Sequence, residues 1–345
     1  MGLGRVSRLL GRDLAVDLGT TTTLVHVRGR GVVLTEPSVV AIDKSTGAVL
    51  AVGTQASRMM GRTPEDIVAL QPLRDGVIAD FDAAEDMLRY FLHTVQPHSY
   101  MARPRLVVST PAGLTGVERR AVEEAGYAAG ARRVYTLEVA MAAAIGADLP
   151  VYEAAGSMVV DIGGGTTEAA VISLGGVVSS ESVPIAGDEM DEAISAFVKK
   201  EYSLLLGQRT TERIKTALGS AFPSPHEPNA EIRGRDMVSG LPRSVMVSAA
   251  EVRAALDEPV MTILDTVRSA LDATPPELAG DIMDSGITLT GGGAQLSGLD
   301  ERLRHELQMP VNVAATPTQA VVRGAGRCVD DFEALKPVLL TGHSR

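Results

Sequence analysis

Residues 157–178 read SMVVDIGGGTTEAAVISLGGVV, and this stretch decides how the rest of the chain is interpreted. Its apolar, β-branched start predicts a buried strand that contains Asp161. Three glycines and two threonines follow, then a second strand, a Gly-Gly turn and a third strand. Glycines let a backbone approach an anion and point its N–H groups at it, and an aspartate there suits a cation's water shell. An ordinary glycine hairpin with Asp161 as a turn former explains the same pattern.

A second copy of this pattern lies near the start of the chain. Residues 17–33 read DLGTTTTLVHVRGRGVV, and residues 161–178 read DIGGGTTEAAVISLGGVV. Both continue from an aspartate through glycine and threonines into an alternating strand, a glycine turn and two valines. The sequence therefore predicts two homologous halves, each with one phosphate-binding hairpin. A third glycine element, residues 287–294 (ITLTGGGA), precedes a helical pattern, as expected where a nucleoside approaches a strand–helix turn.

These elements resemble those of the actin-like ATPase superfamily, and nearly the whole chain is similar to the bacterial MreB and Mbl proteins. The stretches that carry the resemblance include LRDGVIADFDAAEDMLRYF, SMVVDIGGGTTEAAVISLGG and TPPELAGDIMDSGITLTGGGAQLSGLD. It implies an α/β actin-like ATPase fold, in which two RNase H-like halves flank a nucleotide cleft and each carries a small inserted subdomain. The implied parts are a membrane-binding segment at 1–12, subdomain IA at 13–30, 76–145 and 311–345, IB at 31–75, IIA at 146–183 and 248–310, and IIB at 184–247.

The resemblance also implies a site for ATP and Mg²⁺. Asp17 and Asp161 would face the water shell of the cation, one from each hairpin. Asp161 and Thr166 are the candidate catalytic residues, with Thr166 only a weak orienter of water. The residues implied to contact the nucleotide are Asp17, Gly19, Thr20, Thr21, Thr22, Gly163, Gly164, Gly165, Thr166, Gly187, Glu212, Lys215, Gly291, Gly292, Gly293 and Ala294.

Two of these contacts have a simpler interpretation. Glu212 and Lys215 are three residues apart on a predicted helix, so they either clasp the adenosine or form a surface ion pair worth ~0.3 kcal/mol. Gly187 precedes two acidic residues, Asp188 and Glu189, which would also complement the dipole of a helix that starts there. The sequence leaves both alternatives open.

The chain departs from the family where hydrolysis is decided. The family has a glutamate followed by a proline at the positions of Val139 and Ala140, and that glutamate positions the attacking water. Valine has no acceptor lone pair and cannot act as a general base. Glu138 stands one residue early, and on a helix one residue rotates a side chain by about 100°. We therefore expect ATP binding with weak or absent hydrolysis.

Smaller departures affect binding. Thr21 and Thr22 stand where the family usually has alanine and asparagine, and Ala186 stands where it has a glycine. Phosphate contact tolerates these changes, but the choice between ATP and GTP stays open.

Composition limits the classes of function. The chain has 345 residues, 45% of them hydrophobic, which is enough for two domains with large cores. A net charge of −11 and an aromatic content of only 3% without tryptophan argue against nucleic-acid binding. The single cysteine, Cys328, fits a reducing cytoplasm and excludes a disulfide framework. No stretch approaches the ~20 apolar residues of a spanning helix.

Two segments are candidates for membrane contact. Residues 1–12, MGLGRVSRLLGR, place apolar side chains on one side of a helix and arginines mostly on the other. Such a segment lies in a lipid interface, although its glycines also suit an unstructured leader. The resemblance implies that the loop 98–104 also dips into the membrane, although a surface loop with one packed aromatic explains the same residues. The candidate membrane residues are Leu3, Val6, Leu9, Leu10, Tyr100 and Met101.

The resemblance implies a cytoplasmic filament, with paired protofilaments, on the inner face of the cell membrane. Its partners would be further copies of this chain, an MreB paralogue, membrane lipid and transmembrane proteins of cell-wall morphogenesis. A small-molecule kinase on the same fold is a second interpretation, but it lacks a carboxylate base and a pocket-forming insertion. A non-polymerising ATP-binding regulator is a third, and Val139 favours it. The pattern also predicts helices at 83–94, begun by Asp80 or Asp82, and at 248–274, with a break or kink at Pro259.

Overall fold

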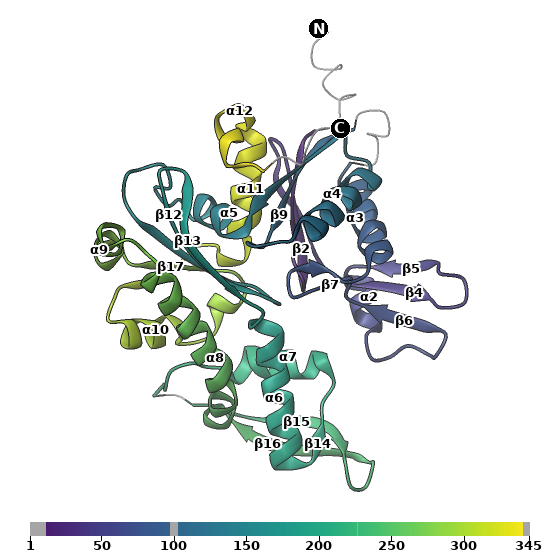
Figure 1. The fold of residues 1–345 in the computed structure, drawn as a ribbon. Helices are drawn as coiled ribbons and strands as arrows, with labels where there is room; N and C mark the ends of the chain where they lie inside the picture. Colours follow the sequence, from purple (N-terminus) through teal and green to yellow (C-terminus); the bar gives the residue numbers. More distant parts are fainter. Residues whose placement is uncertain (1–11, 97–102, 226, 341–345) are drawn as a thin grey trace. The chain divides into compact units, whose positions relative to one another are not determined.

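The structure is a computed structural model that describes residues 12–96, 103–225 and 227–340. These residues form two compact units. The first unit holds the residues through Ala155, the segment Ile172–Val178 and the residues from Thr318 onward. The second unit holds Gly156–Val171 and Ser179–Pro317, drawn mainly in teal and green in Figure 1.

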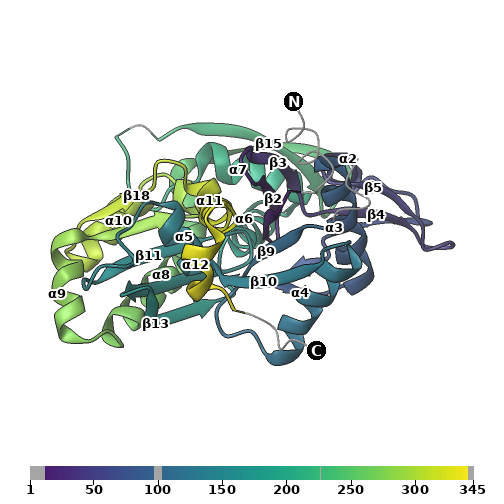
Figure 2. The same cartoon turned by 90° about the horizontal axis from the view of Figure 1, so that it is seen from above.

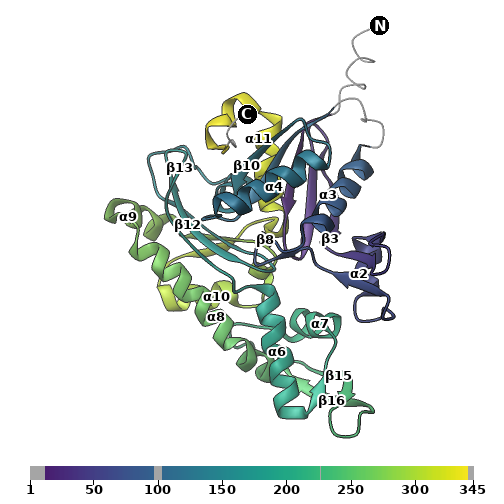
Figure 3. The ribbon, with the colours of Figure 1, turned by 45° about the vertical axis from the view of Figure 1, so that its right-hand side comes forward.

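The first unit is built on a five-stranded sheet with the order β10-β9-β1-β2-β3. β1, β9 and β10 run parallel, whereas β2 runs antiparallel to β1 and to β3. Apolar side chains of this sheet share one core with α3 and α4, which lie side by side in Figure 3, and α11 contacts β1, β2 and β9. The bounds are β1 Leu14–Leu18, β2 Thr22–Val27, β3 Gly31–Pro37, β9 Arg105–Thr110, β10 Arg133–Glu138, α3 Phe81–Val95, α4 Gly116–Ala128, α5 Val139–Gly146, α11 Ala320–Asp330 and α12 Phe332–Leu335.

Smaller elements complete this unit. A three-stranded sheet with the order β5-β4-β6 packs with the short helix α2, and β7 pairs with β8. The Asp80 side chain accepts a hydrogen bond from the backbone N–H of Ala83, which makes Asp80 the N-cap of α3. The bounds are β4 Val40–Asp43, β5 Val49–Val52, β6 Ile67–Leu70, α2 Thr54–Met59, β7 Leu73–Arg74 and β8 Val77–Ile78.

The second unit is built on a sheet with the order β13-β12-β11-β17-β18 and a smaller one with the order β14-β15-β16. Its apolar core joins the larger sheet to α6, α8 and α10. The bounds are β11 Ser157–Ile162, β12 Thr167–Ser173, β13 Gly176–Val183, β14 Leu204–Leu205, β15 Asn229–Asp236, β16 Pro242–Ser248, β17 Ile287–Thr290, β18 Val311–Val313, α6 Gly187–Tyr202, α7 Gln208–Leu218, α8 Ala249–Asp272, α9 Pro276–Ser285 and α10 Leu299–Leu307.

The two five-stranded sheets have the same topology. In each, three strands that are consecutive in the chain are neighbours, and the first of them is followed across the sheet by two parallel strands. β1, β2 and β3 therefore correspond to β11, β12 and β13, while β9 and β10 correspond to β17 and β18. This correspondence confirms the internal repeat predicted from the two hairpin sequences.

The break predicted at Pro259 of α8 is wrong, and the alternative of a kink there stays a prediction. The helix continues without a break through Pro259, although a proline removes one backbone hydrogen bond. A capping box of Ser248 and Glu251 fixes its start, and buried apolar residues before and after Pro259 hold both parts to the core. None of the helices in the described part of the chain has the length and apolar character needed to cross a bilayer.

Two glycines allow α5 and α11 to cross with their backbones in contact. A Cβ atom added to Gly146 would lie 1.8 Å from the carbonyl oxygen of Ala320, and one added to Gly324 would lie 1.8 Å from that of Ala142. Both obstacles are helix backbone, which cannot move aside as a flexible side chain can. The packing of the first unit therefore requires glycine at both positions. Figure 2 shows α5 and α11 side by side.

We predict that Gly324→Ala lowers the free energy of unfolding by about 3 kcal/mol or more, because the two helices must separate. The matched control is Gly280→Ala in α9, where an added Cβ meets nothing within 4 Å. At that exposed position, alanine should be neutral or stabilise the helix by up to about 1 kcal/mol. Urea denaturation measures both changes, and equal effects of the two substitutions would contradict this account of the contact.

Candidate functional site

The first predicted hairpin joins β1 to β2 through a turn at residues 19–21. A Cβ on Gly19 would lie 2.6 Å from the carbonyl oxygen of Thr22, so the turn closes only with glycine there. Ser38 holds the turn from outside, because its hydroxyl donates to the Gly19 carbonyl at 2.6 Å. Thr20 is buried, and its hydroxyl accepts a hydrogen bond from the N–H of Gly76 at 3.1 Å.

Asp17 is held by a hydroxyl of the neighbouring parallel strand. Ser109 on β9 lies opposite Asp17 in the register, and its Oγ donates to Asp17 Oδ1 at 2.7 Å. Desolvation by the surrounding protein raises the pKa of Asp17 to about 6, although the Ser109 hydrogen bond acts in the opposite direction. A carboxylate kept at such a cost is typical of a site that uses its charge.

The second hairpin repeats this arrangement. Asp161 on β11 is buried and lies opposite Thr290 on β17, whose Oγ1 donates to Asp161 Oδ1 at 2.7 Å. Ser109 and Thr290 therefore donate equivalent hydrogen bonds to the aspartates of the two repeats. Neither Ser109 nor Thr290 is among the site residues predicted from the sequence. The available signal was that the strands VVST and ITLT, which correspond in the repeat, both end in hydroxyl side chains.

The glycine turn after Asp161 is bonded to the start of α6. The N–H of Gly163 donates to the carbonyl of Thr166 at 2.9 Å, which closes the turn. The N–H groups of Gly187 and Asp188 donate to the carbonyls of Gly163 and Gly164, at 3.2 and 2.8 Å. The structure thus places Gly187, at the start of α6, against the hairpin. The N–H group of Gly187, however, donates its hydrogen bond to the Gly163 carbonyl of the hairpin.

Lys215 also lies at the start of α6, but its ion-pair partner is Asp191 and not Glu212. Its Nζ donates to the carbonyl of Gly187 at 2.6 Å and lies 3.0 Å from Asp191 Oδ2 on α6. Burial raises the pKa of Asp191, and Lys215 partly offsets this effect. Glu212 is exposed and forms no ion pair with Lys215 in the described residues, so the surface ion pair of these two residues is absent.

The third glycine element lies directly beside Asp161. Gly291 has a φ of +83°, and a Cβ there would lie 2.2 Å from the carbonyl oxygen of Ile162. A Cβ on Gly293 would lie 2.3 Å from a methyl carbon of Ile162, whereas Gly292 is exposed and has open space around it. The second unit thus gathers Asp161, the turn 163–166, the start of α6, Lys215 and the loop 291–294 in one place.

The residues present suit a nucleotide with a hydrated cation. Each hairpin combines close glycine packing with one desolvated aspartate, and Mg²⁺ commonly binds through one or two carboxylates, water and phosphate oxygens. Among the described residues, no group of three or more His, Cys, Asp and Glu side chains could hold a metal alone. Bound Mg²⁺ would therefore take its other ligands from water and from phosphate oxygens.

The expected catalytic position lies at a strand–helix junction of the first unit. β10 ends at Glu138, and Val139 is the first residue of α5. Glu138 has the backbone conformation of an N-cap, but its side chain makes no capping hydrogen bond.

The candidate membrane residues lie outside the described residues. They are Leu3, Val6, Leu9, Leu10, Tyr100 and Met101.

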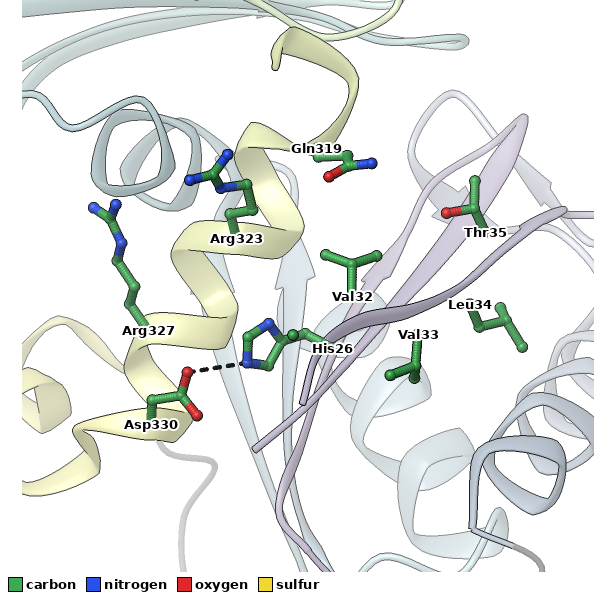
Figure 4. Close-up of a pocket in the computed structure, with 10 residues that line it drawn as sticks. His26, Val32, Val33, Leu34, Thr35, Gln319, Arg323, Arg327 and Asp330 are labelled. Atoms are coloured by element: carbon green, nitrogen blue, oxygen red, sulfur yellow. Dashed lines mark hydrogen bonds and ion pairs between the residues drawn. The ribbon is translucent and has the colours of Figure 1, made fainter. Parts of the chain in front are cut away.

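A separate groove in the first unit contains none of the predicted nucleotide contacts. It has a volume of about 630 Å³ and lies between β3 and α11, with His26 of β2 at its floor. Figure 4 shows the His26 ring directed at Asp330, with Nε2 lying 3.1 Å from Oδ2. Gly326 makes room for the ring, since a Cβ there would lie 2.4 Å from Nδ1. This groove is therefore distinct from the candidate nucleotide site.

The raised pKa of Asp17 predicts a stability cost. Folding favours the protonated form of Asp17. The loss of stability is therefore absent at pH values below the unfolded pKa of 3.8 and complete at pH values above about 6. We expect Asp17→Asn to raise the free energy of unfolding of nucleotide-free protein by about 1–3 kcal/mol at pH 7.5, and by about half as much at pH 5. The control is Asp66→Asn, at an exposed turn. A destabilisation by Asp17→Asn that is equal at both pH values would overturn this prediction.

Comparisons with known proteins place the chain in a family. The model of the MreB/Mbl protein family matches residues 11–337. The chain is 48% identical to the cell shape-determining protein Mbl of Bacillus subtilis, over 95% of this chain and 98% of the relative. It is 51% identical to the cell shape-determining protein MreB of Escherichia coli K12, over 93% of this chain and 94% of the relative.

A solved structure agrees with these relatives. MreB5 of Spiroplasma citri bound to ADP matches with a TM-score of 0.89 and 37% identity, over 95% of this chain and 98% of that one. The same protein bound to AMPPNP matches with a TM-score of 0.89 and 36% identity, over the same shares. The two repeated sheets, the paired hairpins and these matches agree: the chain belongs to the MreB/Mbl family and has the actin-like ATPase fold.

Proposed function

We propose that this protein is an ATP-binding filament protein that works on the inner face of the cell membrane and helps to determine cell shape. The observation that carries the proposal is the repeated aspartate, held in both halves by an in-register hydroxyl beside a glycine turn. Relatives named for cell shape determination support the cellular role. The structures of MreB5 with ADP and AMPPNP support nucleotide binding.

In this proposal, different residues hold the cation, the phosphates and the nucleoside of Mg-ATP. Asp17 and Asp161 orient water molecules on the cation, which neutralises phosphate charge when bound. The turn 19–22 and the turn 163–166 offer N–H and hydroxyl donors to the phosphates. Lys215 and Glu212, with the loop 291–294, hold the nucleoside.

Lys215 also fixes the start of α6, because it bonds both the Gly187 carbonyl and Asp191. A change at Lys215 would therefore disturb the phosphate turn through Gly187, beyond the loss of any direct contact with adenosine.

Hydrolysis is slow in this proposal. Val139 offers no acceptor to an attacking water, and Thr166 alone orients it weakly. Loss of a general base typically costs about 10²–10⁴-fold in rate. The nucleotide then acts mainly as a ligand that stabilises one conformation of the protein, and subunits in that conformation stack head to tail.

The filament would pair into double protofilaments, bind lipid through residues 1–12 and the loop 98–104, and engage transmembrane proteins of cell-wall morphogenesis. Nucleic acid is no partner in this proposal, because the net charge is −11. A second candidate is a non-polymerising ATP-binding regulator, or a partner that enters filaments of an MreB paralogue. Val139 favours this candidate, since a subunit that does not hydrolyse ATP suits regulation.

One experiment tests binding, assembly and hydrolysis together. Purified protein with Mg-ATP should sediment as filaments while releasing phosphate at close to the background rate. Val139→Glu should raise phosphate release at least about tenfold, because it restores an acceptor at the first residue of α5. Val139→Gln, of nearly the same size but without a basic carboxylate, is the control.

The outcomes separate the candidates. Sedimentation with Mg-ATP and with AMPPNP supports the filament, whereas nucleotide binding without sedimentation supports the regulator. Family-typical turnover in the unmodified protein would refute the assignment of slow hydrolysis to Val139. A failure to bind any nucleoside triphosphate would end the proposal.

A further inference from the structure

One end of the five-stranded sheet in the first unit gathers seven arginines. The register places the starts of β1, β9 and β10 together, because Leu14 lies opposite Leu106 and Arg133 lies opposite Arg105. β2 is antiparallel, so its end meets the same edge, where Val27 lies opposite Leu14. Short segments before and after these strands therefore share one side of the unit. We call them the arginine edge, and its arginines are Arg12, Arg28, Arg30, Arg103, Arg105, Arg132 and Arg133.

The arginine edge is organised around one buried carboxylate. Asp13 accepts two hydrogen bonds from the Arg105 guanidinium, at 2.9 and 2.6 Å, and lies 3.8 Å from Arg28 and 3.7 Å from Arg132. Arg105 also lies over the ring of Phe332, 4.0 Å from its centre. Asp13 thus holds one arginine tightly and leaves two others about half exposed, with 48% and 57% of their side chains accessible.

The positive charge of this edge is only partly neutralised. Arg30 and Arg133 are exposed and form no ion pair with any described residue. Asp330 accepts a hydrogen bond from the N–H of Gly29, and Asp331 and Glu333 adjoin Phe332 in the chain. The contacts place only Asp13 and Asp330 at this edge, and even with Asp331 and Glu333 counted there are four carboxylates for seven arginines, so the edge keeps an excess of positive charge on a chain whose net charge is −11.

The spread of these arginines decides the kind of ligand. They cover the four strands from β10 to β2, and three strand spacings of ~4.8 Å amount to about 14 Å. Arg28, Arg105 and Arg132 converge on the one carboxylate of Asp13, but the exposed Arg30 and Arg133 are left outside that cluster, and an extended anionic surface such as lipid headgroups can contact them together. The acidic remainder of the chain and its few aromatic side chains disfavour a nucleic acid.

We propose that the arginine edge binds the phosphate groups of anionic lipids and so selects anionic membrane. The proposal rests on the membrane association included in the proposed function. The two stretches predicted to contact the membrane join the folded chain at this edge, at Arg12 and at Arg103. The described arginines alone make the site, and they add a requirement for lipid charge to the apolar contact expected of those stretches.

The test uses full-length protein and co-sedimentation with vesicles of phosphatidylcholine, with and without phosphatidylglycerol. Each basic residue near an anionic surface contributes about five-fold to partitioning. Arg30→Gln with Arg133→Gln should therefore weaken binding to anionic vesicles about 20-fold to 30-fold and leave binding to neutral vesicles unchanged. The charge-matched control is Arg58→Gln with Arg62→Gln, at exposed positions in the same unit, which should change neither.

Each other outcome has a defined meaning. Equal losses in the two double variants, or none in either, would overturn the proposal. Displacement from vesicles by glycerol phosphate at low millimolar concentration would assign the arginines to a soluble phosphate ligand, and would also overturn it. If the unmodified protein binds neutral and anionic vesicles equally, lipid selection is wrong but membrane association stands. If it binds neither, both fail, while nucleotide binding and filament assembly are untouched.

Discussion

The candidate nucleotide site is organised by a hydrogen bond that occurs twice, from a hydroxyl on one parallel strand to an aspartate on its neighbour. Ser109 holds Asp17, and Thr290 holds Asp161, each at 2.7 Å and each directly across the register. A hydrogen bond from a neutral hydroxyl fixes the direction of a carboxylate without adding a positive charge beside it. An arginine partner would add one. The fold itself therefore holds both aspartates in one orientation.

The surrounding structure supports these two groups at a cost. Burial raises the pKa of Asp17 to about 6, so the folded chain holds a charge that it would more easily hold unfolded. Close backbone packing elsewhere offsets such costs. Gly146 and Gly324 let α5 and α11 meet without side chains between them, and α11 in turn covers the sheet that carries Asp17. The close helix packing of the first unit and the desolvated Asp17 thus lie in adjacent elements.

Much of this could be predicted from the sequence, because the hairpins carry local signals. Asp161 and its glycines predicted a strand–turn–strand, and the matching letters at residues 17–33 predicted the repeat that the two sheet topologies confirm. Contacts between distant segments were beyond such reasoning. Nothing local links Ser109 to Asp17, or Lys215 to Asp191, because those pairs form only when the strands and helices assemble. At Pro259 a local signal was misleading. Proline predicts a break, but burial of α8 against the core keeps the helix continuous.

The proposed function requires both aspartates to act on one bound cation. The most direct measurement is calorimetric titration of Mg-ATP into the unmodified protein, Asp17→Asn, Asp161→Asn and the double variant. Asparagine keeps an oxygen for the Ser109 or Thr290 hydroxyl, so each change removes mainly the charge. The account predicts a loss of about tenfold or more from each single change, and a smaller loss from the double variant than the product of the two, because the groups share a ligand. Unchanged affinity in either single variant, or losses that multiply without coupling, would contradict it.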